Sequence, residues 1–191
     1  MIEKYNEILQ KLEDFESELY LLESNNSVVK TLKNFIAFEK GKKPNSLDVD
    51  GPLYLTIDTL EGNEPLYTKS NKVVNCVESN VLMVMDGASS GKVYIGNEGV
   101  VGSTLSLIKT KYINEYYLYI FLKNNYNNIK DRNTGSAIPH TNKDYVLSLN
   151  IPMNRIDNSI YDDLFKYRIA ITKNINRLKS LKAAYLNKFF K

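Results

Sequence analysis

The sequence offers few side chains with the spacing that catalysis requires. Residues 87–93 (Gly-Ala-Ser-Ser-Gly-Lys-Val) resemble a phosphate-binding loop, but that motif has four residues between its glycines and a hydroxyl side chain after the lysine. Here three residues separate Gly87 from Gly91, and Val93 follows Lys92. We therefore interpret this segment as a tight turn between two strands and not as a nucleotide site.

The other reactive residue types are isolated. The single cysteine, Cys76, lies in an apolar run, where a buried and inert thiol is the usual case, and the single histidine, His140, follows Pro139 in a polar stretch. One cysteine and one histidine argue against a structural zinc site. Residues 150–153 lack the second proline and the aromatic residue of an adenine-methyltransferase loop, and the chain contains no Glu-x-Lys nuclease motif. The sequence thus predicts a protein that is not an enzyme and that holds no metal or cofactor.

The composition is typical of a folded globular protein. The chain has 191 residues, of which 43% are hydrophobic and 25% are charged, so it can bury a sizeable core. Its apolar runs are shorter than the roughly 20 residues of a membrane-spanning helix. Met1 leads into charged sequence rather than a signal peptide, and a lone cysteine suits a reducing compartment. We therefore expect a cytoplasmic protein that does not contact a membrane.

The net charge of +3 conceals an uneven distribution. Residues 1–24 carry two basic and seven acidic side chains, a net charge of −5. Residues 155–191 carry nine basic and three acidic side chains, a net charge of +6, and the segment between them has a net charge of +2. Two ends of opposite charge therefore flank a nearly neutral body, and the total alone does not indicate a nucleic-acid-binding protein.

Both ends are predicted to be long helices, because apolar residues recur there at alternating steps of three and four. The N-terminal seam comprises Tyr5, Ile8, Leu12, Phe15, Leu19 and Leu22, and Ile2 and Leu9 widen it. The C-terminal seam comprises Ile160, Leu164, Tyr167, Ile171, Asn174, Leu178, Leu181 and Tyr185, with Ile175 and Phe189 alongside. Ser159 with Asp162 resembles an N-terminal helix cap.

An acidic and a basic amphipathic helix of similar length would pair well in an antiparallel hairpin. Two architectures follow: the helices form a protruding coiled-coil arm, or they pack on a globular core. We favour the arm. The predicted domains are an N-terminal spacer helix at 1–25, a central domain at 26–154 and a C-terminal spacer helix at 155–191.

Short apolar or alternating runs in the middle of the chain predict β-strands. They are residues 52–58, 73–77, 81–85, 92–95 and 104–108. Residues 114–128 predict a helix, which is followed by a polar loop over 130–142 and an apolar segment over 145–152. The predicted fold class is therefore α+β, with one mixed, mainly β domain flanked by two long helices.

Basic side chains of the middle segment fall in the predicted loops. Lys40, Lys42 and Lys43 precede Pro44, while Lys130 and Arg132 open the polar loop. Lysine and arginine neutralise phosphates, whereas asparagine, arginine and threonine can read base edges. Composition alone favours a DNA-binding surface no more than ordinary solvated loops.

A set of motifs in a fixed order favours the DNA-binding interpretation. Residues 81–95 resemble the "D-x-L-x-x-x-x-G-A-x-x-G-K-x" hairpin of type I restriction–modification DNA specificity subunits. Other segments are similar to motifs of that family, in order: residues 38–44 (G-K-x-P), 52–58 (Y-x-x-I-x-D), 114–122 (Y-L-x-x-x-L), 134–142 (G-S-x-x-x-x-I) and 149–152 (I-P-x-P). Usual members carry two recognition domains, so the chain resembles a half-length form with a single target-recognition domain.

The resemblance implies a non-catalytic subunit that reads half of a bipartite site in double-stranded DNA and docks a DNA methyltransferase (modification) subunit. It leaves open whether a restriction subunit also binds. Two-fold pairing of the terminal helices would give a homodimer. The residues expected near DNA are Lys42, Lys43, Ser89, Lys92, Arg132, Asn133 and His140. The alternatives are a recognition module of a combined restriction–methylation enzyme and a protein-binding coiled-coil adaptor with no DNA role.

Overall fold

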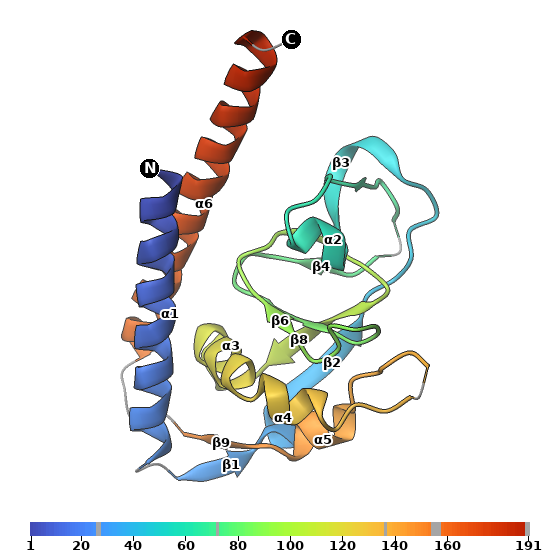
Figure 1. Cartoon of the computed structure of the whole chain (residues 1–191). Helices are drawn as coiled ribbons and strands as arrows, with labels where there is room; N and C mark the ends of the chain where they lie inside the picture. The colour runs from blue at the N-terminus through green and yellow to red at the C-terminus, as the bar shows by residue number, and fades with distance from the viewer. Residues whose placement is uncertain (26–27, 72, 136, 154–157, 190–191) are drawn as a thin grey trace. The chain divides into compact units, whose positions relative to one another are not determined.

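The computed structural model describes residues 1–25, 28–71, 73–135, 137–153 and 158–189, and the chain divides into two compact units. One unit, the helical unit, combines Met1–Ser27 with Asn154–Lys191. The other, the central unit, is Val28–Met153. Figure 1 gives the order of their elements.

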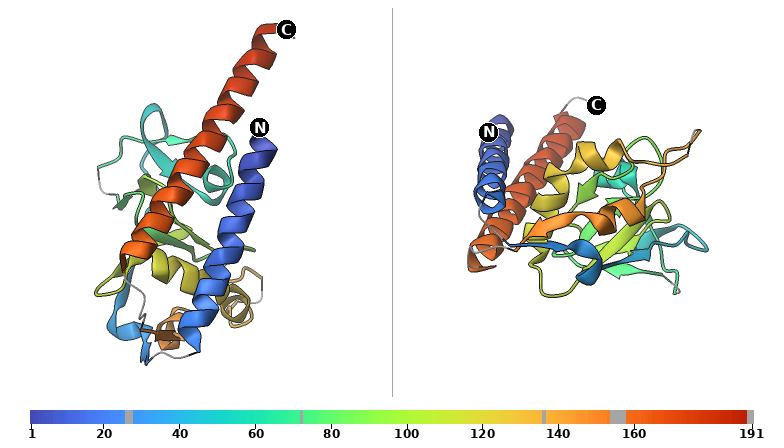
Figure 2. Two further views of the ribbon diagram at one scale, coloured as in Figure 1. Left: turned by 90° about the vertical axis from the view of Figure 1, so that its left-hand side faces the viewer. Right: turned by 90° about the horizontal axis from the view of Figure 1, so that it is seen from below.

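The helical unit consists of α1 (Ile2–Ser24) and α6 (Asn158–Phe189), which confirms the two predicted long helices. They run antiparallel and side by side (Figure 2). Because α6 already includes Asn158, Ser159 lies inside the helix, and the predicted cap at Ser159 is wrong. Neither of these helices nor any other described helix combines the length and the apolar character needed to cross a lipid bilayer.

The helices meet along the central row of the predicted seam and along one of its two flanks. The line of α1 that is buried or half-buried comprises Ile2, Tyr5, Leu9, Leu12, Glu16, Leu19 and Glu23. The matching line of α6 comprises Tyr161, Leu164, Arg168, Ile171, Ile175 and Leu178. Phe15, Leu22 and Tyr167 of the predicted seam are 48%, 69% and 69% exposed. The prediction is therefore right for the central row of each helix and wrong for one flank.

The physical reason is that charged residues occupy the buried flank. Glu16 is 1% exposed, and two of its oxygen atoms accept hydrogen bonds from the guanidinium of Arg168. Glu23 accepts a hydrogen bond from the hydroxyl of Tyr161 at 3.4 Å. A pattern based on apolar residues places such positions in solvent, whereas mutual hydrogen bonding allows them to be buried.

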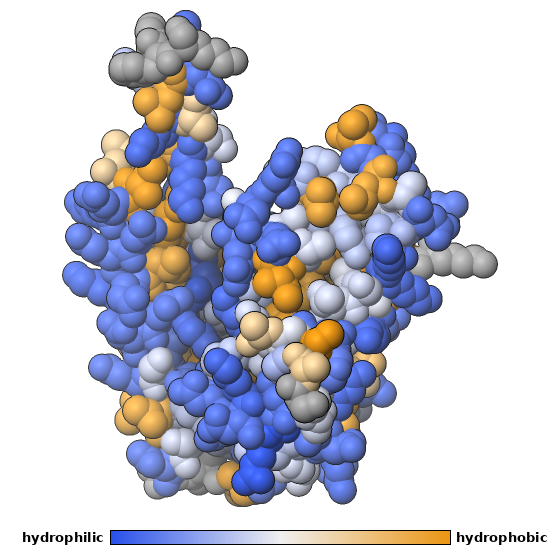
Figure 3. Space-filling view, turned by 45° about the vertical axis from the view of Figure 1, so that its right-hand side comes forward, coloured by the Kyte–Doolittle hydropathy of each residue, from blue (hydrophilic) through white to orange (hydrophobic). Residues whose placement is uncertain are grey.

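The exposed flanks form a second apolar line, which we call the outer stripe. It comprises Ile8, Phe15 and Leu22 of α1 and Ile160, Tyr167 and Leu181 of α6. Figure 3 shows apolar side chains along the helical unit among hydrophilic ones. Both helices therefore carry apolar residues beyond those they use against each other.

The central unit contains three small sheets. A two-stranded antiparallel ribbon pairs β1 (Val29–Thr31) with β9 (Asn150–Pro152). An antiparallel four-stranded sheet has the order β2 (Ile36–Lys40), β8 (Leu105–Thr110), β5 (Val81–Val84) and β6 (Val93–Tyr94). A three-stranded mixed sheet has the order β3 (Asp48–Leu55), β7 (Gly99–Val101) and β4 (Asn75–Cys76). Together with the paired long helices, these sheets confirm the α+β class.

Short helices connect the strands. They are the 3₁₀ helix η1 (Leu32–Asn34) and the α-helices α2 (Ile57–Leu60), α3 (Glu115–Asn124), α4 (Tyr126–Lys130) and α5 (Lys143–Ser148). Asn114 caps α3, since its side-chain oxygen accepts from the backbone N–H groups of Tyr116 and Tyr117 at 2.9 and 3.2 Å. All residues of α3 from Tyr116 to Leu122 are buried, as expected for a helix that is apolar on every side.

Three predicted elements end earlier or are divided. The strand predicted over 52–58 stops at Leu55, because Thr56 caps α2 by accepting from the backbone N–H of Thr59 at 3.2 Å. The apolar segment over 145–152 is divided between α5 and β9, and the helix predicted over 114–128 is divided at Asn125 into α3 and α4.

Cys76 is buried, as predicted from the apolar run that contains it. Its residue is 3% exposed, and burial raises the pKa of the thiol to about 11. It belongs to an apolar cluster with Leu55, Val84 and Leu105, which joins the two larger sheets into one core.

Candidate nucleic-acid interface

The turn between β5 and β6 is tight, as predicted, and begins at Asp86. The N–H of Ser90 donates to the carbonyl of Gly87 at 3.0 Å, and the N–H of Gly91 donates to that of Val84 at 2.9 Å. The buried hydroxyl of Ser90 lies 2.6 Å from the carbonyl oxygen of Gly87, inside the turn. These contacts fix the backbone that carries the half-buried Ser89.

The predicted polar loop folds back on itself as a hairpin. The N–H of Thr134 donates to the carbonyl of His140 at 2.9 Å, and the N–H of His140 donates to the carbonyl of Thr134 at 2.7 Å. The loop is therefore closed by pairing of Thr134 with His140, which a polar composition alone does not indicate.

This hairpin is bonded to the β5–β6 turn. The N–H of Gly87 donates to the carbonyl of Pro139 at 2.9 Å. Thr141 donates through its hydroxyl to the carbonyl of Val84 at 2.6 Å, and the Ser90 hydroxyl lies 2.9 Å from the Pro139 carbonyl. We call residues 86–91 together with 132–135 and 137–141 the paired loops. Their backbones hold one another in place, so the side chains they carry have defined positions.

Asp86 lies at the centre of the paired loops. Its Oδ1 is 2.7 Å from Nδ1 of His140, and its Oδ2 is 3.4 Å from Nζ of Lys40 at the end of β2. The side chains of His140 and Lys40 are 51% and 56% exposed, whereas that of Asp86 is 27% exposed. One carboxylate thus positions two exposed nitrogen-bearing side chains.

Two other predicted site residues also belong to the paired loops, and they differ in orientation. The amide nitrogen of Asn133 donates to the carbonyl of Ser90 at 3.3 Å, and its Oδ1 is buried, so the amide is directed into the fold. Arg132 is exposed, and its guanidinium lies 5.8 Å from the ring centre of Tyr145.

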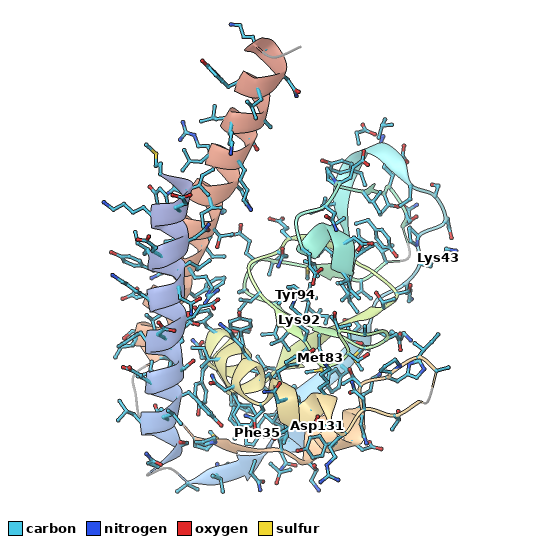
Figure 4. The ribbon with its side chains drawn as sticks, viewed as in Figure 1. Phe35, Lys43, Met83, Lys92, Tyr94 and Asp131 are labelled. Atoms are coloured by element: carbon cyan, nitrogen blue, oxygen red, sulfur yellow. The ribbon has the colours of Figure 1, made fainter. Side chains whose placement is uncertain are left out.

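The side chain of Lys92 forms an ion pair with Glu61. Its Nζ lies 2.9 Å from Glu61 Oε1, to which the hydroxyl of Tyr94 also donates at 3.0 Å. The hydrogen bond from Lys92 lowers the pKa of Glu61, and the same bond raises the pKa of Lys92. Figure 4 labels Lys92 and Tyr94 beside each other. A phosphate would have to compete with Glu61 for this lysine.

Lys42 and Lys43 lie in the segment after β2 and are exposed. The backbone of this segment is fixed, because the N–H of Gly41 donates to the carbonyl of Leu105 at 2.9 Å and that of Lys42 to the carbonyl of Val101 at 3.2 Å. Figure 4 places Lys43 well away from Lys92. The paired loops therefore hold Ser89, Arg132, Asn133 and His140. Lys92 follows them directly, with its N–H bonded to the carbonyl of Ser89 at 3.0 Å, but its side chain is bonded to Glu61, and Lys42 and Lys43 lie in the separate segment after β2.

Three contributors to the site were not among the predicted residues. Asp86 is acidic, so a search for anion-binding residues passes over it, and Lys40 belongs to a strand rather than a loop. Gly135 has a φ of +88°, and a Cβ there would lie 2.4 Å from the carbonyl oxygen of Ile138 and 2.9 Å from Cδ2 of His140. The position of Asp86 directly before the Gly-Ala pair of the hairpin motif is the only sequence signal for this group.

The chain is similar in sequence to one family of proteins. Residues 24–182 match the family described as type I restriction modification DNA specificity domain. The type I restriction enzyme MjaVIII specificity subunit of Methanocaldococcus jannaschii is 29% identical over 171 residues, which cover 82% of this chain and 40% of that protein.

Solved structures share the fold. The S subunit of a type I restriction–modification system from M. genitalium has a TM-score of 0.55 and 16% identity, over 83% of this chain and 41% of that one. The HsdS subunit from Thermoanaerobacter tengcongensis has a TM-score of 0.54 and 13% identity, over 94% of this chain and 50% of that one. The chain thus spans half or less of the length of these relatives.

Proposed function

We propose, on the premise that this chain belongs to the type I restriction–modification DNA specificity family, that its central unit reads one half of a bipartite DNA target and catalyses no reaction. The observation that carries the proposal is the family match, which extends over the whole central unit. The paired loops support it. They hold exposed hydrogen-bonding side chains on a fixed backbone, as direct reading of base edges requires.

We expect Arg132→Ala to weaken binding to the preferred duplex by about 1–3 kcal/mol and to relax the preference at one base position, because an arginine fork pairs best with guanine. Tyr145 orients the guanidinium, as the 5.8 Å ring contact indicates. The measurement is selection from a randomised duplex library, followed by titration of enriched and scrambled duplexes.

Lys43→Ala is the matched comparison, since an exposed lysine that contacts phosphate should weaken binding to all duplexes equally and reduce the salt dependence. Equal losses on both duplexes for Arg132→Ala would assign Arg132 to the phosphates. If the unmodified chain, together with its methyltransferase subunit, enriches no duplex, the proposed function is wrong. Capture of that subunit without any enrichment of DNA would favour the adaptor function.

The helical unit is proposed to bind the methyltransferase subunit and a second copy of this chain. The outer stripe supports this, because it leaves apolar residues of both helices exposed. A groove includes Ile8 and Tyr167 of the stripe and is otherwise lined by Tyr5, Lys166, Ala170, Ile171 and Asn174. The net charges of −5 and +6 at the two ends favour a two-fold arrangement in which α1 of one copy faces α6 of the other.

We expect the chain to sediment as a dimer at micromolar concentration and Tyr167→Glu to convert it to a monomer, since a charge in the outer stripe would be buried on association. Lys179→Glu, at an exposed position of the same helix outside the stripe, is the control and should remain dimeric. Helical circular dichroism should be unchanged in both variants. A stable monomer of the unmodified chain, with the methyltransferase subunit present as well, contradicts the homodimer.

A further inference from the structure

We propose that Asp86 fixes the tautomer of His140, so that His140 presents a hydrogen-bond acceptor to the exocyclic amino group of an adenine or a cytosine. The proposal rests on the proposed function, because it takes the paired loops to face DNA. It adds the chemical identity of one contact, the base types it selects and the residue that determines the selection.

The hydrogen bond at Nδ1 determines the tautomer. Asp86 Oδ1 lies 2.7 Å from Nδ1 of His140, and an ionised carboxylate can only accept. In the neutral imidazole this contact places the proton on Nδ1, which leaves Nε2 with a lone pair and no hydrogen. His140 thus offers an acceptor on its outer side.

The ring is also held in orientation. The backbones of Asp86 and His140 are bridged, as are those of Thr134 and His140. Gly135 lies so close to Cδ2 of the ring that a Cβ would be 2.9 Å away. Nδ1 and Cδ2 are the two ring atoms next to Cγ, so contacts at both leave the edge formed by Cε1 and Nε2 as the remaining one. The side chain is 51% exposed, which makes that edge available to a ligand.

Lys40 completes the arrangement. Its Nζ lies 3.4 Å from Oδ2 of Asp86, on the other carboxylate oxygen from the one that His140 contacts. The two carboxylate oxygens therefore have different partners: Oδ2 faces the ammonium group of Lys40 and Oδ1 faces the imidazole of His140.

An acceptor at Nε2 selects among base pairs by chemistry. In the major groove the amino groups of adenine N6 and cytosine N4 donate, whereas guanine presents only acceptors and thymine an acceptor and a methyl group. We expect the chain to prefer adenine or cytosine at one position of its half-site and to disfavour guanine and thymine there.

The test reverses the hydrogen bond. In Asp86→Asn the side-chain oxygen should face Lys40 and the amide NH2 should face His140, because only this orientation satisfies both partners. The amide then donates to Nδ1 and the proton moves to Nε2, which becomes a donor. At that position cytosine, which offers no acceptor in the major groove, should become disfavoured and guanine and thymine should become accepted, while adenine stays accepted through its N7. His140→Ala should remove the preference at that position alone, by about tenfold.

Two readouts distinguish the possible outcomes. Because the chain has one histidine, nitrogen NMR with labelled histidine reports its tautomer in the free protein, and we expect the Nδ1–H form in the unmodified chain and the Nε2–H form in Asp86→Asn. Selection from randomised duplexes reports the base preference. Asp50→Asn, which alters another exposed carboxylate paired with a lysine of the central unit, Lys69, should change neither readout.

The Nε2–H tautomer in the unmodified chain overturns the inference whatever the DNA result. So does a preference that Asp86→Asn and His140→Ala leave unchanged at every position while the unmodified chain still enriches a duplex; in that case the proposed function survives. If the unmodified chain enriches no duplex, the base contact and the proposed function are both overturned, whatever tautomer the NMR shows.

Discussion

Replacing Arg168 with methionine is expected to lower the free energy of unfolding of the helical unit by about 3–5 kcal/mol, the usual effect of breaking a buried ion pair. Methionine has a similar length but no donors. It would leave Glu16, whose side chain is 2% exposed, as a buried carboxylate without its cation.

The geometry explains why so much depends on this side chain. Arg168 donates to both oxygens of Glu16, with the shortest contact at 2.8 Å, and to Glu13 Oε1 at 3.3 Å. Glu16 is sealed between the two helices, whereas the side chain of Glu13 is 31% exposed and can turn to water. The loss therefore arises mainly at Glu16.

Hydrogen exchange in α1 and α6 measures this loss directly in the full chain, and chemical denaturation followed at 222 nm supports it. Arg177→Met is the matched control, because Arg177 lies on the same helix and is exposed; it should change the free energy by less than about 0.5 kcal/mol. Glu16→Leu combined with Arg168→Met should be close to neutral or more stable than the unmodified chain. If Arg168→Met loses no more than Arg177→Met, the network does not stabilise the helix pair.

The polar contacts of the helical unit also specify register. Glu16 faces Arg168 and Glu23 faces Tyr161, so the second pair lies seven residues further along α1 and seven residues earlier along α6. Sliding α6 by one heptad would place Glu16 opposite Ile175 or Tyr161, and its charge would lose the guanidinium. Apolar seams tolerate such slips, whereas a buried charge penalises them.

Gly41→Ala is expected to destabilise the central unit by about 3 kcal/mol, through overpacking against backbone that cannot move aside. A Cβ at this position would lie 2.1 Å from the carbonyl oxygen of Gly102 and 2.5 Å from that of Val101. Relief of these contacts would break the hydrogen bonds of Gly41 to Leu105 and of Lys42 to Val101.

Thermal and urea denaturation measure the effect of Gly41→Ala, and Gly62→Ala is its control. Gly62 has a φ of +88°, but a Cβ there would meet nothing within 4 Å, so its substitution should cost about 1 kcal/mol through backbone strain alone. A loss at Gly41 no larger than that at Gly62 would show that the strand end can shift without breaking its bonds. Because Lys42 and Lys43 follow directly, we also expect weaker DNA binding by Gly41→Ala.

The helices and strands can be predicted from the sequence more accurately than the contacts between them. Heptad spacing and opposite charge are sufficient to predict α1 and α6, and apolar runs mark β5 and β8. The apolar pattern extends the seam to one flank that is exposed, because Ile8, Phe15 and Leu22 are as regular as the buried positions. Only the partner helix shows that the buried Glu16 is hydrogen-bonded.

The short helices depend on caps that an apolar pattern does not register. Asn142, for example, begins α5 by accepting from the backbone N–H of Tyr145 at 3.0 Å, in a segment whose apolar residues equally suit a strand.

The contacts of the candidate site are still harder to predict from the sequence. His140 and Asn133 could be predicted as polar loop residues, but their opposite orientations could not, because they depend on Asp86 and Ser90, which lie 54 and 43 positions away. The exposed imidazole and the inward amide are products of the pairing between two loops. Linear motifs contain no information on that pairing.

The ribbon of β1 and β9 has a consequence for how such a chain can change over time. Val29 pairs with Pro152, Thr31 pairs with Asn150, and the N–H of Met153 donates to the carbonyl of Val28 at 2.8 Å. The central unit therefore begins and ends at adjacent points, and one uninterrupted stretch of coding sequence specifies everything between them. A single genetic exchange bounded by this ribbon would replace the proposed DNA-reading part whole, whatever the length of the incoming segment, and would leave the code for both long helices untouched.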